Sequence, residues 1–558
     1  MSQSSPEVAP HRFWLVIGAI VLLTFIAYHR TFTYPFHFDG QTNIQAKLAA
    51  KEITWDSFPT GPRSLVDLSW QLNHRIGGEN TLGYHVVNYI IHVAASLLLL
   101  GFVYSTLRLP NIPESFQANA LTLAATIAIL WAIHPLQTQS VTYITQRYES
   151  LMGLFFLLTM VCLCRGSTAA RATGWYVGCI AAGLAATLCK EVAIVLPLVM
   201  LWYDRAFLAS SWAEILRKRW WVYGGVFCGW LILAQVFGVS LDSLERGGAV
   251  IVEDTLYTEA GVVRRTVGPL EYLYSQGRAI PFYLQLTLFP VGQSLDHGWR
   301  ASFSLAEVIW PGIVVVLLLG LTIWAIFKAP RLSFLGGWFF LILAPTSSIL
   351  PIRDIVFEHR MYLPLAAVLS AIVLGIFALL KSWEGAGKRE SMQMTASQGL
   401  MVLLVLLVAI YGSVTIARNE VYRSDFAMWQ DVIDKNPRHA RAYHGMAHSF
   451  VMRDDWESAI PYLEKTIELD PEYAFKPYYG KQFFAGAKLA LEHDNLPMAV
   501  RLLDLTIKMD PQHVDAYVML SKLLSRQNRR RSVALLQLAV KIDPNHAEAQ
   551  QTLRQMTQ

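Results

Sequence analysis

The chain has 558 residues, of which 54% are hydrophobic and only 16% are charged, and its formal net charge is +5. A soluble domain carries about 25% charged residues, so this composition argues against an ordinary soluble globular protein. The basic residues lie mostly in short loops without a concentrated patch of interleaved aromatic side chains, which argues against a nucleic-acid-binding surface.

Long apolar runs predict an all-α fold, a polytopic bundle of about eleven transmembrane helices. A bilayer core of about 30 Å needs roughly 20 apolar residues in helical form. Segment 271–290 is apolar but contains Glu271 and Arg278, so we expect a re-entrant or interfacial helix there. The expected spans are 13–30, 85–106, 118–134, 150–165, 174–189, 191–203, 221–238, 303–327, 333–350, 362–380 and 397–417.

Lysines and arginines gather in alternate loops, and this asymmetry predicts the orientation in the membrane. The loops that contain Arg108, Arg165, Arg205, Lys328 and Lys381 are expected to be cytoplasmic. With a cytoplasmic N-terminus and eleven spans, the C-terminal domain is expected on the periplasmic or other outer face of a cell (inner) membrane. A single crossing by 271–290 would reverse this parity.

The last part of the chain has a different composition, with more charge and no long apolar run. We therefore divide the sequence into a transmembrane domain, 1–419, and a C-terminal domain, 420–558. Asn-Pro or Asp-Pro pairs recur near the 34-residue period of tetratricopeptide (TPR) repeats, with an insertion expected in 473–481. Such an array is either a scaffold or a concave surface for a protein or peptide. The pairs are Asn436-Pro437, Asp470-Pro471, Asp510-Pro511 and Asp543-Pro544.

Polar residues follow the first expected span on the outer face. Asp39 lies close to the end of that span, where its carboxylate could act as a general base on an acceptor hydroxyl. The alternative is an Asp that only forms a turn before Gly40. His85, Asn88 and His92 share one face of the second span, where packing or hydrogen bonding between helices is a better interpretation than metal ligation.

Two further sites could hold an anion. Arg147 lies at the mouth of the bundle, and it could instead pair with Glu149 or a lipid head group. The segment 351–362 contains Arg353, His359 and Arg360, and guanidinium groups suit the phosphate of a lipid that enters from the bilayer. The alternative is a solvated loop closed by the pairs Arg353–Asp354 and Glu358–Arg360.

The ordered motifs carry a resemblance to a known family. The sequence is similar to the transmembrane-and-TPR-containing O-mannosyltransferases and their bacterial relatives, which resemble the wider GT-C class of glycosyltransferases. The resemblance extends over nearly the whole chain. Its motifs are an Asp after the first span, Pro62–Asn73, Gly83–His92, His134–Val141, Gln146–Glu149, Lys190-Glu191, Ser294–His297 and Glu358–Pro364.

The resemblance implies an inverting transfer of sugar from a polyprenyl phosphate to a hydroxyl of an exported protein, at an external active site. Asp39 would be the catalytic carboxylate, and Arg360, His359, Arg147 and Arg353 would bind the donor phosphate. The residues that would shape the site are Arg63, His85, His134, Glu149, Lys190, Glu191, Asp296 and Glu358.

The chain departs from the family pattern at two positions. Gly40 stands where relatives often have a second Asp, and Gln139 stands where an acid is common. We therefore expect no cofactor and no metal ligands, although the sequence leaves dependence on a divalent metal open.

Other functions remain open at this point. The acceptor could be a lipid or a surface polysaccharide, or the chain could be a non-catalytic TPR scaffold for envelope assembly. A transporter is disfavoured because the charges gather in loops and no internal inverted repeat is present.

Overall fold

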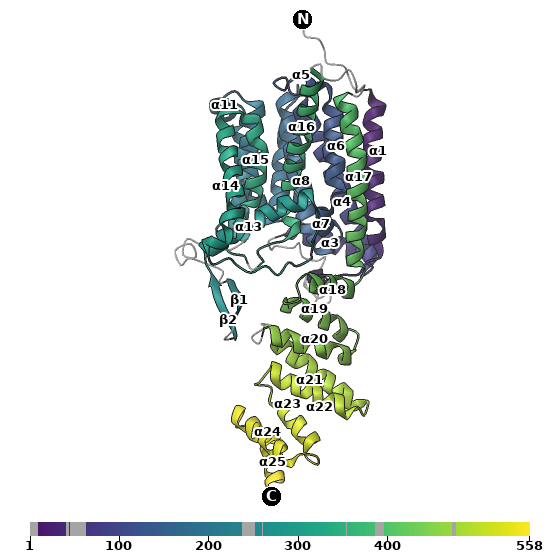
Figure 1. Ribbon diagram of the computed structural model, residues 1–558, viewed down its shortest axis with the longest axis vertical. Coiled ribbons are helices and arrows are strands. Elements are labelled where there is room, and N and C mark those ends of the chain that lie inside the picture. The colour runs from purple at the N-terminus through teal and green to yellow at the C-terminus, as the bar shows by residue number, and fades with distance from the viewer. Residues whose placement is uncertain are drawn as a thin grey trace. The chain divides into compact units, whose positions relative to one another are not determined.

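The computed structural model describes residues 9–40, 44, 63–236, 252–258, 261–352, 354–385, 395–470 and 476–558. Backbone contacts divide the chain into two compact units, Met1–Lys435 and Asn436–Gln558. Both units are built almost entirely of helices, which confirms the predicted all-α class (Figure 1).

Six helices of the first unit are long and apolar enough to cross a membrane, and a bent pair is a seventh when it is counted as one span. A helix suits these runs because it pairs its own backbone groups where no water is present. The chain is therefore a membrane protein. The helices are α1 (Pro10–Tyr28), α4 (Thr81–Leu107), α8 (Arg147–Thr168), α14 (Leu305–Lys328), α16 (Pro364–Gly385) and α17 (Ala396–Glu420), and the bent pair begins with α6 (Ala120–Ala132).

The expected number of spans, about eleven, exceeds the number of described helices that pass by length and composition. Several expected runs form shorter helices: α9 (Thr173–Thr187) has 15 residues, α10 (Leu196–Tyr203) has 8 and α15 (Pro330–Leu343) has 14. Helix α15 ends at Leu343, two residues before Pro345.

Helix α6 and the segment after it form the bent pair. His134-Pro135 interrupts the helix, and η3 (Pro135–Gln137) and α7 (Thr138–Val141) continue at 53° to α6. Proline cannot donate the backbone bond that would continue the helix. The chain then enters η4 (Ile144–Gln146) and α8, so 134–147 is a compact polar turn between two apolar helices.

One end of the bundle is covered by short helices and a long loop. Figure 1 places α3 (Ser64–Gly77), α7 and α13 (Pro269–Leu288) at this end and α5 (Glu114–Ala118) at the other. Segment 271–290 is thus α13, which is not among the candidate spans. The remaining helices are η1 (His29–Thr33), η5 (Glu191–Val195), η6 (Asp204–Leu208), α11 (Trp212–Val236), η7 (Glu358–Met361), η8 (Val421–Arg423) and α18 (Asp425–Lys435).

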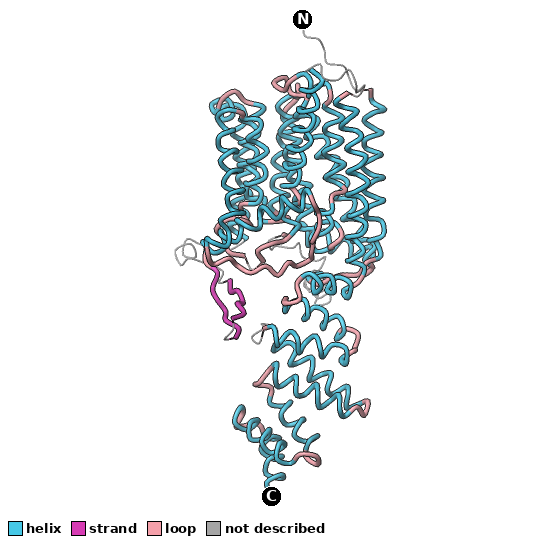
Figure 2. Tube along the Cα trace, viewed as in Figure 1, coloured by secondary structure: helices cyan, strands magenta, loops and turns pink. Residues whose placement is uncertain are grey.

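A β-hairpin precedes α13, and the sequence interpretation missed it. Strands β1 (Val252–Thr258) and β2 (Gly261–Val267) are antiparallel, with Val252 opposite Val267 and Thr258 opposite Gly261 (Figure 2).

Glycines let aromatic rings approach the helix backbone in the bundle. A Cβ on Gly153 of α8 would lie 2.5 Å from the Tyr362 ring, and one on Gly337 of α15 would lie 2.8 Å from Trp202. Close approach of this kind is typical of membrane helices, where dispersion contacts replace the hydrophobic effect.

The second unit is a succession of antiparallel helix pairs. Each Asp of an Asp-Pro step (Asp470, Asp510, Asp543) caps the C-terminus of the second helix in a pair. The long interval before Asp510 contains α21, which has 17 residues, whereas residues 471–475 of the expected insertion lie outside the described part. The helices are α19 (Ala440–Val451), α20 (Trp456–Leu469), α21 (Lys476–Glu492), α22 (Leu496–Met509), α23 (Val514–Leu524), α24 (Arg529–Ile542) and α25 (Ala547–Thr557).

The division between the units falls after Lys435, whereas the sequence predicted a boundary at 419/420. Helix α18 belongs to the first unit because it packs beneath α17 through η8 and contacts loops of the bundle. This position brings α18 to the polar end that carries the candidate site.

Candidate functional site

The segment 134–147 organises the candidate site. Most of its residues are buried although many are polar, and burying a polar group is costly unless it is hydrogen-bonded. Thr142 donates to the Asn419 side chain on α17 at 2.6 Å, and Asn419 donates to the Ala27 carbonyl of α1 at 2.8 Å. The segment is therefore fixed to the first and last helices of the bundle.

Asp39 contacts this segment through Tyr143. The Asp39 N–H donates to the Tyr143 hydroxyl over 2.9 Å. Burial, and next the Asp39 carboxylate, raise the pKa of Tyr143 well above its usual value. The hydroxyl therefore stays protonated, and Asp39 is held at the edge of the site while remaining partly exposed.

The backbone around Asp39 explains the glycine that follows it. Phe38 has a positive φ of 43°, which turns the chain sharply before Asp39. A Cβ on Gly40 would lie 3.3 Å from the Thr145 hydroxyl, so a second Asp there would require Thr145 to move by a few tenths of an ångström. The loop accommodates one carboxylate with the neighbours that this chain has.

His359 contacts the same segment through Gln139, four residues before Tyr143. The His359 N–H and its ring Nδ1 both lie on the Gln139 Oε1, at 2.8 and 3.1 Å. Gln139 also donates to the Leu295 carbonyl at 2.9 Å. Asp39 and His359 are thus held at one end of the bundle by neighbouring turns of one segment. The Gln139 side chain fits this role because its amide both accepts and donates hydrogen bonds, which an ionised carboxylate cannot do.

A set of positive charges surrounds His359. Burial lowers the pKa of His359 well below its usual value, and the charges of Lys190, Arg360 and Arg63 lower it further. The imidazole is therefore neutral near pH 7 and can donate a proton from Nδ1 to Gln139.

Arg360 uses its hydrogen-bond donors within the protein. Its guanidinium donates to the backbone carbonyls of Thr346, Asp354 and Ile355 at 3.1, 2.5 and 2.9 Å. These bonds hold the loop before η7, and the side chain is almost fully buried. A phosphate bound to Arg360 would have to replace one of these carbonyls. Arg353 lies outside the described residues.

Arg147 is enclosed in the same manner. It donates to Asn88, Asn73 and Ser69 at 2.6, 2.6 and 3.0 Å and to the Tyr84 carbonyl at 2.9 Å. All four partners lie on α3 and α4, so Arg147 joins these helices to the start of α8.

Two ion pairs lie beside this centre. Lys190 and Glu149 form a short, buried pair. Arg63 and Glu191 form a two-point pair, with Nη2–Oε1 and Nε–Oε2 distances of 2.8 and 3.3 Å. The Arg63 guanidinium also stacks on Tyr148 at 4.6 Å. The Arg63 side chain is 37% exposed, which makes it more accessible than Arg147, Lys190 or Arg360.

Glu358 does not close its loop against Arg360, so the alternative pairing proposed from the sequence is wrong. The carboxylate instead accepts bonds from the Gln293 side chain, the Ser294 N–H and His297, at 2.6, 2.6 and 3.1 Å. Burial alone would raise the pKa of Glu358, but the bond to His297 and nearby Arg418 lower it. Glu358 therefore stays ionised and fixes the 293–297 loop.

Asp296 belongs to this same loop. Its carboxylate accepts the Gly298 N–H at 2.9 Å, which closes a turn, and its side chain is almost fully buried.

The two histidines assigned to shape the site have structural partners. His85 lies 3.0 Å from the Tyr34 carbonyl, which fixes the loop after α1. His134 lies 2.9 Å from the Thr287 carbonyl and accepts the Leu136 N–H at 3.2 Å. Among the described residues, no group of three or more His, Cys, Asp or Glu side chains could hold a metal ion.

The sequence interpretation missed Tyr143 and His37 as site residues. His37 binds Asp425 at 2.6 Å and the Tyr422 carbonyl at 2.5 Å, and neighbouring Phe38 packs on Trp429. The only signals in the sequence were the position of His37 just before Asp39 and the position of Tyr143 inside the segment 134–147. Their partners lie far along the chain, because Tyr143 contacts Asp39 across 104 positions and His37 contacts Asp425 across 388.

Comparison of the sequence with known proteins finds one group of similar enzymes. No family model matches the chain. The chain is 21% identical over 531 residues to protein O-mannosyl-transferase Tmtc3 of Drosophila melanogaster, covering 84% of this chain and 56% of that protein. It is a homologue of the TMTC protein O-mannosyl-transferases.

Human relatives give the same result. The human TMTC1 protein is 24% identical over 74% of this chain and 48% of its own length. The human TMTC2 protein is 32% identical over 146 residues, which are 25% of this chain and 16% of that protein. The chain thus spans about half or less of the curated TMTC relatives that it matches.

Proposed function

We propose that the chain is a membrane glycosyltransferase that moves a sugar from a polyprenyl-phosphate donor to a Ser or Thr hydroxyl of an exported protein. The observation that carries this proposal is the shared anchoring of Asp39 and His359 on the segment 134–147, through Tyr143 and Gln139. The names of the TMTC relatives support a protein acceptor.

In this proposal Asp39 is the general base. It takes the proton from the acceptor hydroxyl as that oxygen attacks the anomeric carbon, and the lipid phosphate leaves with the bonding electrons. General-base catalysis contributes about 10² to 10⁴-fold in rate. The partial exposure of Asp39 suits this role because the acceptor must reach it from outside the bundle.

Positive charge near His359 would stabilise the leaving phosphate. Arg63 is the accessible member of the cluster, and its guanidinium would exchange Glu191 for a phosphate. Arg360, His359 and Arg147 would act without direct contact, by fixing the loops, and the two arginines would add positive charge. The donor tail would stay in the bilayer, and the helix pairs of the second unit would hold the acceptor polypeptide on the outer face.

A cellular experiment separates this proposal from a non-catalytic scaffold. Exported glycoproteins are compared by mass spectrometry between cells with the wild-type protein and cells with Asp39→Asn. We expect the variant to insert normally and one protein-linked sugar to disappear. Unchanged glycoproteins with normal insertion would favour the scaffold, and a change confined to lipids or polysaccharide would favour that acceptor instead.

A further inference from the structure

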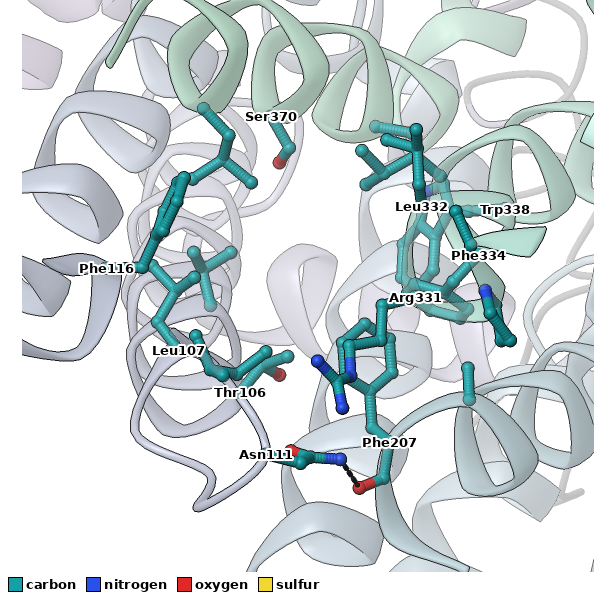
Figure 3. A pocket seen from close by; sticks show the side chains of 18 of the residues that line it. Thr106, Leu107, Asn111, Phe116, Phe207, Arg331, Leu332, Phe334, Trp338 and Ser370 are labelled. Carbon is teal, nitrogen blue, oxygen red and sulfur yellow. Dashed lines mark hydrogen bonds between the residues drawn. The ribbon is translucent and has the colours of Figure 1, made fainter. Parts of the chain in front are cut away.

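A cavity of about 990 Å³ lies inside the membrane bundle, away from the site described above. It lies between the C-terminal half of α4, the loop that leads to α5, and helices α15 and α16. Figure 3 shows Leu107 and Phe116 on one wall and Phe334 and Trp338 on the other. The volume matches the largest small-molecule sites, which reach roughly 1,000 Å³ and are mostly apolar.

The cavity lies at the opposite end of the bundle from Asp39. The Asp39 loop packs on the first turn of α4, where Phe36 meets Tyr84 at 5.0 Å between ring centroids. The cavity instead uses the last part of the same helix, Leu99 to Leu107. Helix α4 has 27 residues, and a rise of 1.5 Å per residue separates its ends by about 40 Å. The cavity is therefore separate from the proposed active site.

Three positive side chains line the mouth of the cavity: Arg205, Lys328 and Arg331. None of them forms a hydrogen bond or an ion pair with another residue in the described part of the chain, and no described Asp or Glu lines the cavity. In Figure 3 the Arg331 side chain extends across the opening toward Asn111 and Thr106.

Another arginine at the same end shows the contrast. Arg219 is buried in a two-point pair with Asp204, with both distances 2.6 Å. The cations at the cavity mouth thus differ from this buried arginine, because no described carboxylate pairs with them. Guanidinium and ammonium groups both bind phosphate oxygens well.

We propose that this cavity binds an anionic glycerophospholipid of the bilayer, with one acyl chain between α4, α15 and α16 and the phosphate among Arg205, Lys328 and Arg331. The apolar walls fit a hydrocarbon chain, and the unopposed charge at the mouth fits the head group. A polyprenyl-phosphate donor is disfavoured as the occupant, because its phosphate would have to react about 40 Å away, by the length of α4.

The test measures lipid retention by the purified full chain in detergent, using native mass spectrometry. Phosphatidylglycerol, phosphatidylcholine with the same acyl chains, and a polyprenyl phosphate are added in turn and in competition. Two variants act on the two halves of the site. Arg205→Ala/Lys328→Ala/Arg331→Ala removes the charge, and Gly375→Phe fills the apolar part, where nothing lies within 4 Å of a built Cβ.

A matched control removes three cations from the same end that do not line the cavity: Arg165→Ala/Arg217→Ala/Lys218→Ala. We expect the wild type and this control to retain phosphatidylglycerol at least tenfold better than phosphatidylcholine. The triple variant at the mouth should lose this preference, and Gly375→Phe should lose the bound lipid. Equal retention by all variants, no preference for the anionic lipid, or preferential retention of the polyprenyl phosphate would overturn the assignment.

Discussion

His37 and Asp425 form a 2.6 Å contact that ties the loop of Asp39 to α18. The other ring nitrogen of His37 lies 2.5 Å from the Tyr422 carbonyl. The two ring nitrogens of His37 thus face the Asp425 carboxylate and the Tyr422 carbonyl. The last helix of the membrane unit thereby holds the first loop of the chain, together with the proposed catalytic acid.

His37→Ala should therefore lower sugar transfer by about tenfold or more and destabilise the protein by about 1–3 kcal/mol, the cost of leaving a charged or polar partner unsatisfied. The measurement is transferase activity of the purified variant together with its thermal unfolding midpoint. Arg30→Gln, which removes an exposed pair with Glu420 beside the same loop, is the control and should change both values little. Equal activity of His37→Ala and wild type would show that the contact does not position Asp39.

The buried pair between Lys190 and Glu149 gives a second prediction. Lys190→Met leaves the Glu149 carboxylate without its partner, and breaking a buried pair costs about 3–5 kcal/mol. The double variant Lys190→Met/Glu149→Gln should recover much of that loss because no charge remains buried. Thermal unfolding of the wild type, both single variants and the double variant completes the cycle. A double variant as unstable as the sum of the singles would contradict this interpretation.

Gly153 tests the packing behind the site. A Cβ there would lie 2.5 Å from the Tyr362 ring, so Gly153→Ala must displace Tyr362 and should destabilise the bundle by about 1–3 kcal/mol. The matched control is Gly101→Ala on α4, where nothing lies within 4 Å of a built Cβ. This control should be neutral or stabilising, since alanine has less conformational freedom in the unfolded chain. Unfolding midpoints that rank the two variants in the opposite order would refute the packing.

The burial of neutral His359 predicts a dependence on pH. Its pKa is held well below 6.5 in the folded protein, so the unfolded chain binds the proton more readily once the pH falls below about 6.5. Stability should therefore fall as the pH decreases from 7 to 5. Ionised Glu358 and Glu191 have lowered pKa values, so their contribution is lost only at a lower pH.

The corresponding variant is His359→Asn, which keeps a donor toward Gln139 but does not titrate. Apparent unfolding midpoints at a fixed scan rate should decline less between pH 7 and 5 in His359→Asn than in the wild type. Parallel curves for the two proteins would mean that His359 does not carry this pH dependence.

The apolar runs predicted the long helices well because each must satisfy its own backbone in lipid. The Asp-Pro steps also predicted helix ends in the second unit, since Asp470, Asp510 and Asp543 each cap one. The hairpin was missed because its first strand, 252–258, reads Val-Glu-Asp-Thr-Leu-Tyr-Thr and lacks the strict polar-apolar alternation that signals a strand.

The candidate site was predictable in its parts but not in its contacts. Asp39 and Glu358 were named as candidate residues from their motifs, and a pair between Glu358 and nearby Arg360 was one alternative that the sequence offered. The fold instead brings His297 to Glu358 and three backbone carbonyls to Arg360, because a long loop crosses this end of the bundle. Local spacing cannot reveal such partners, and neither can it reveal the contact of Asp39 with Tyr143.

The most direct test of the account uses purified full-length protein in detergent with a radiolabelled polyprenyl-phosphate-linked sugar and a Ser/Thr-rich peptide. The initial rate of sugar transfer to the peptide is measured for the wild type, Asp39→Asn and Glu79→Gln, which removes an exposed carboxylate from the same end of the bundle. The account predicts that Asp39→Asn lowers the rate about 10² to 10⁴-fold while Glu79→Gln does not change it. Transfer by Asp39→Asn at the wild-type rate would contradict the assignment of Asp39 as the general base.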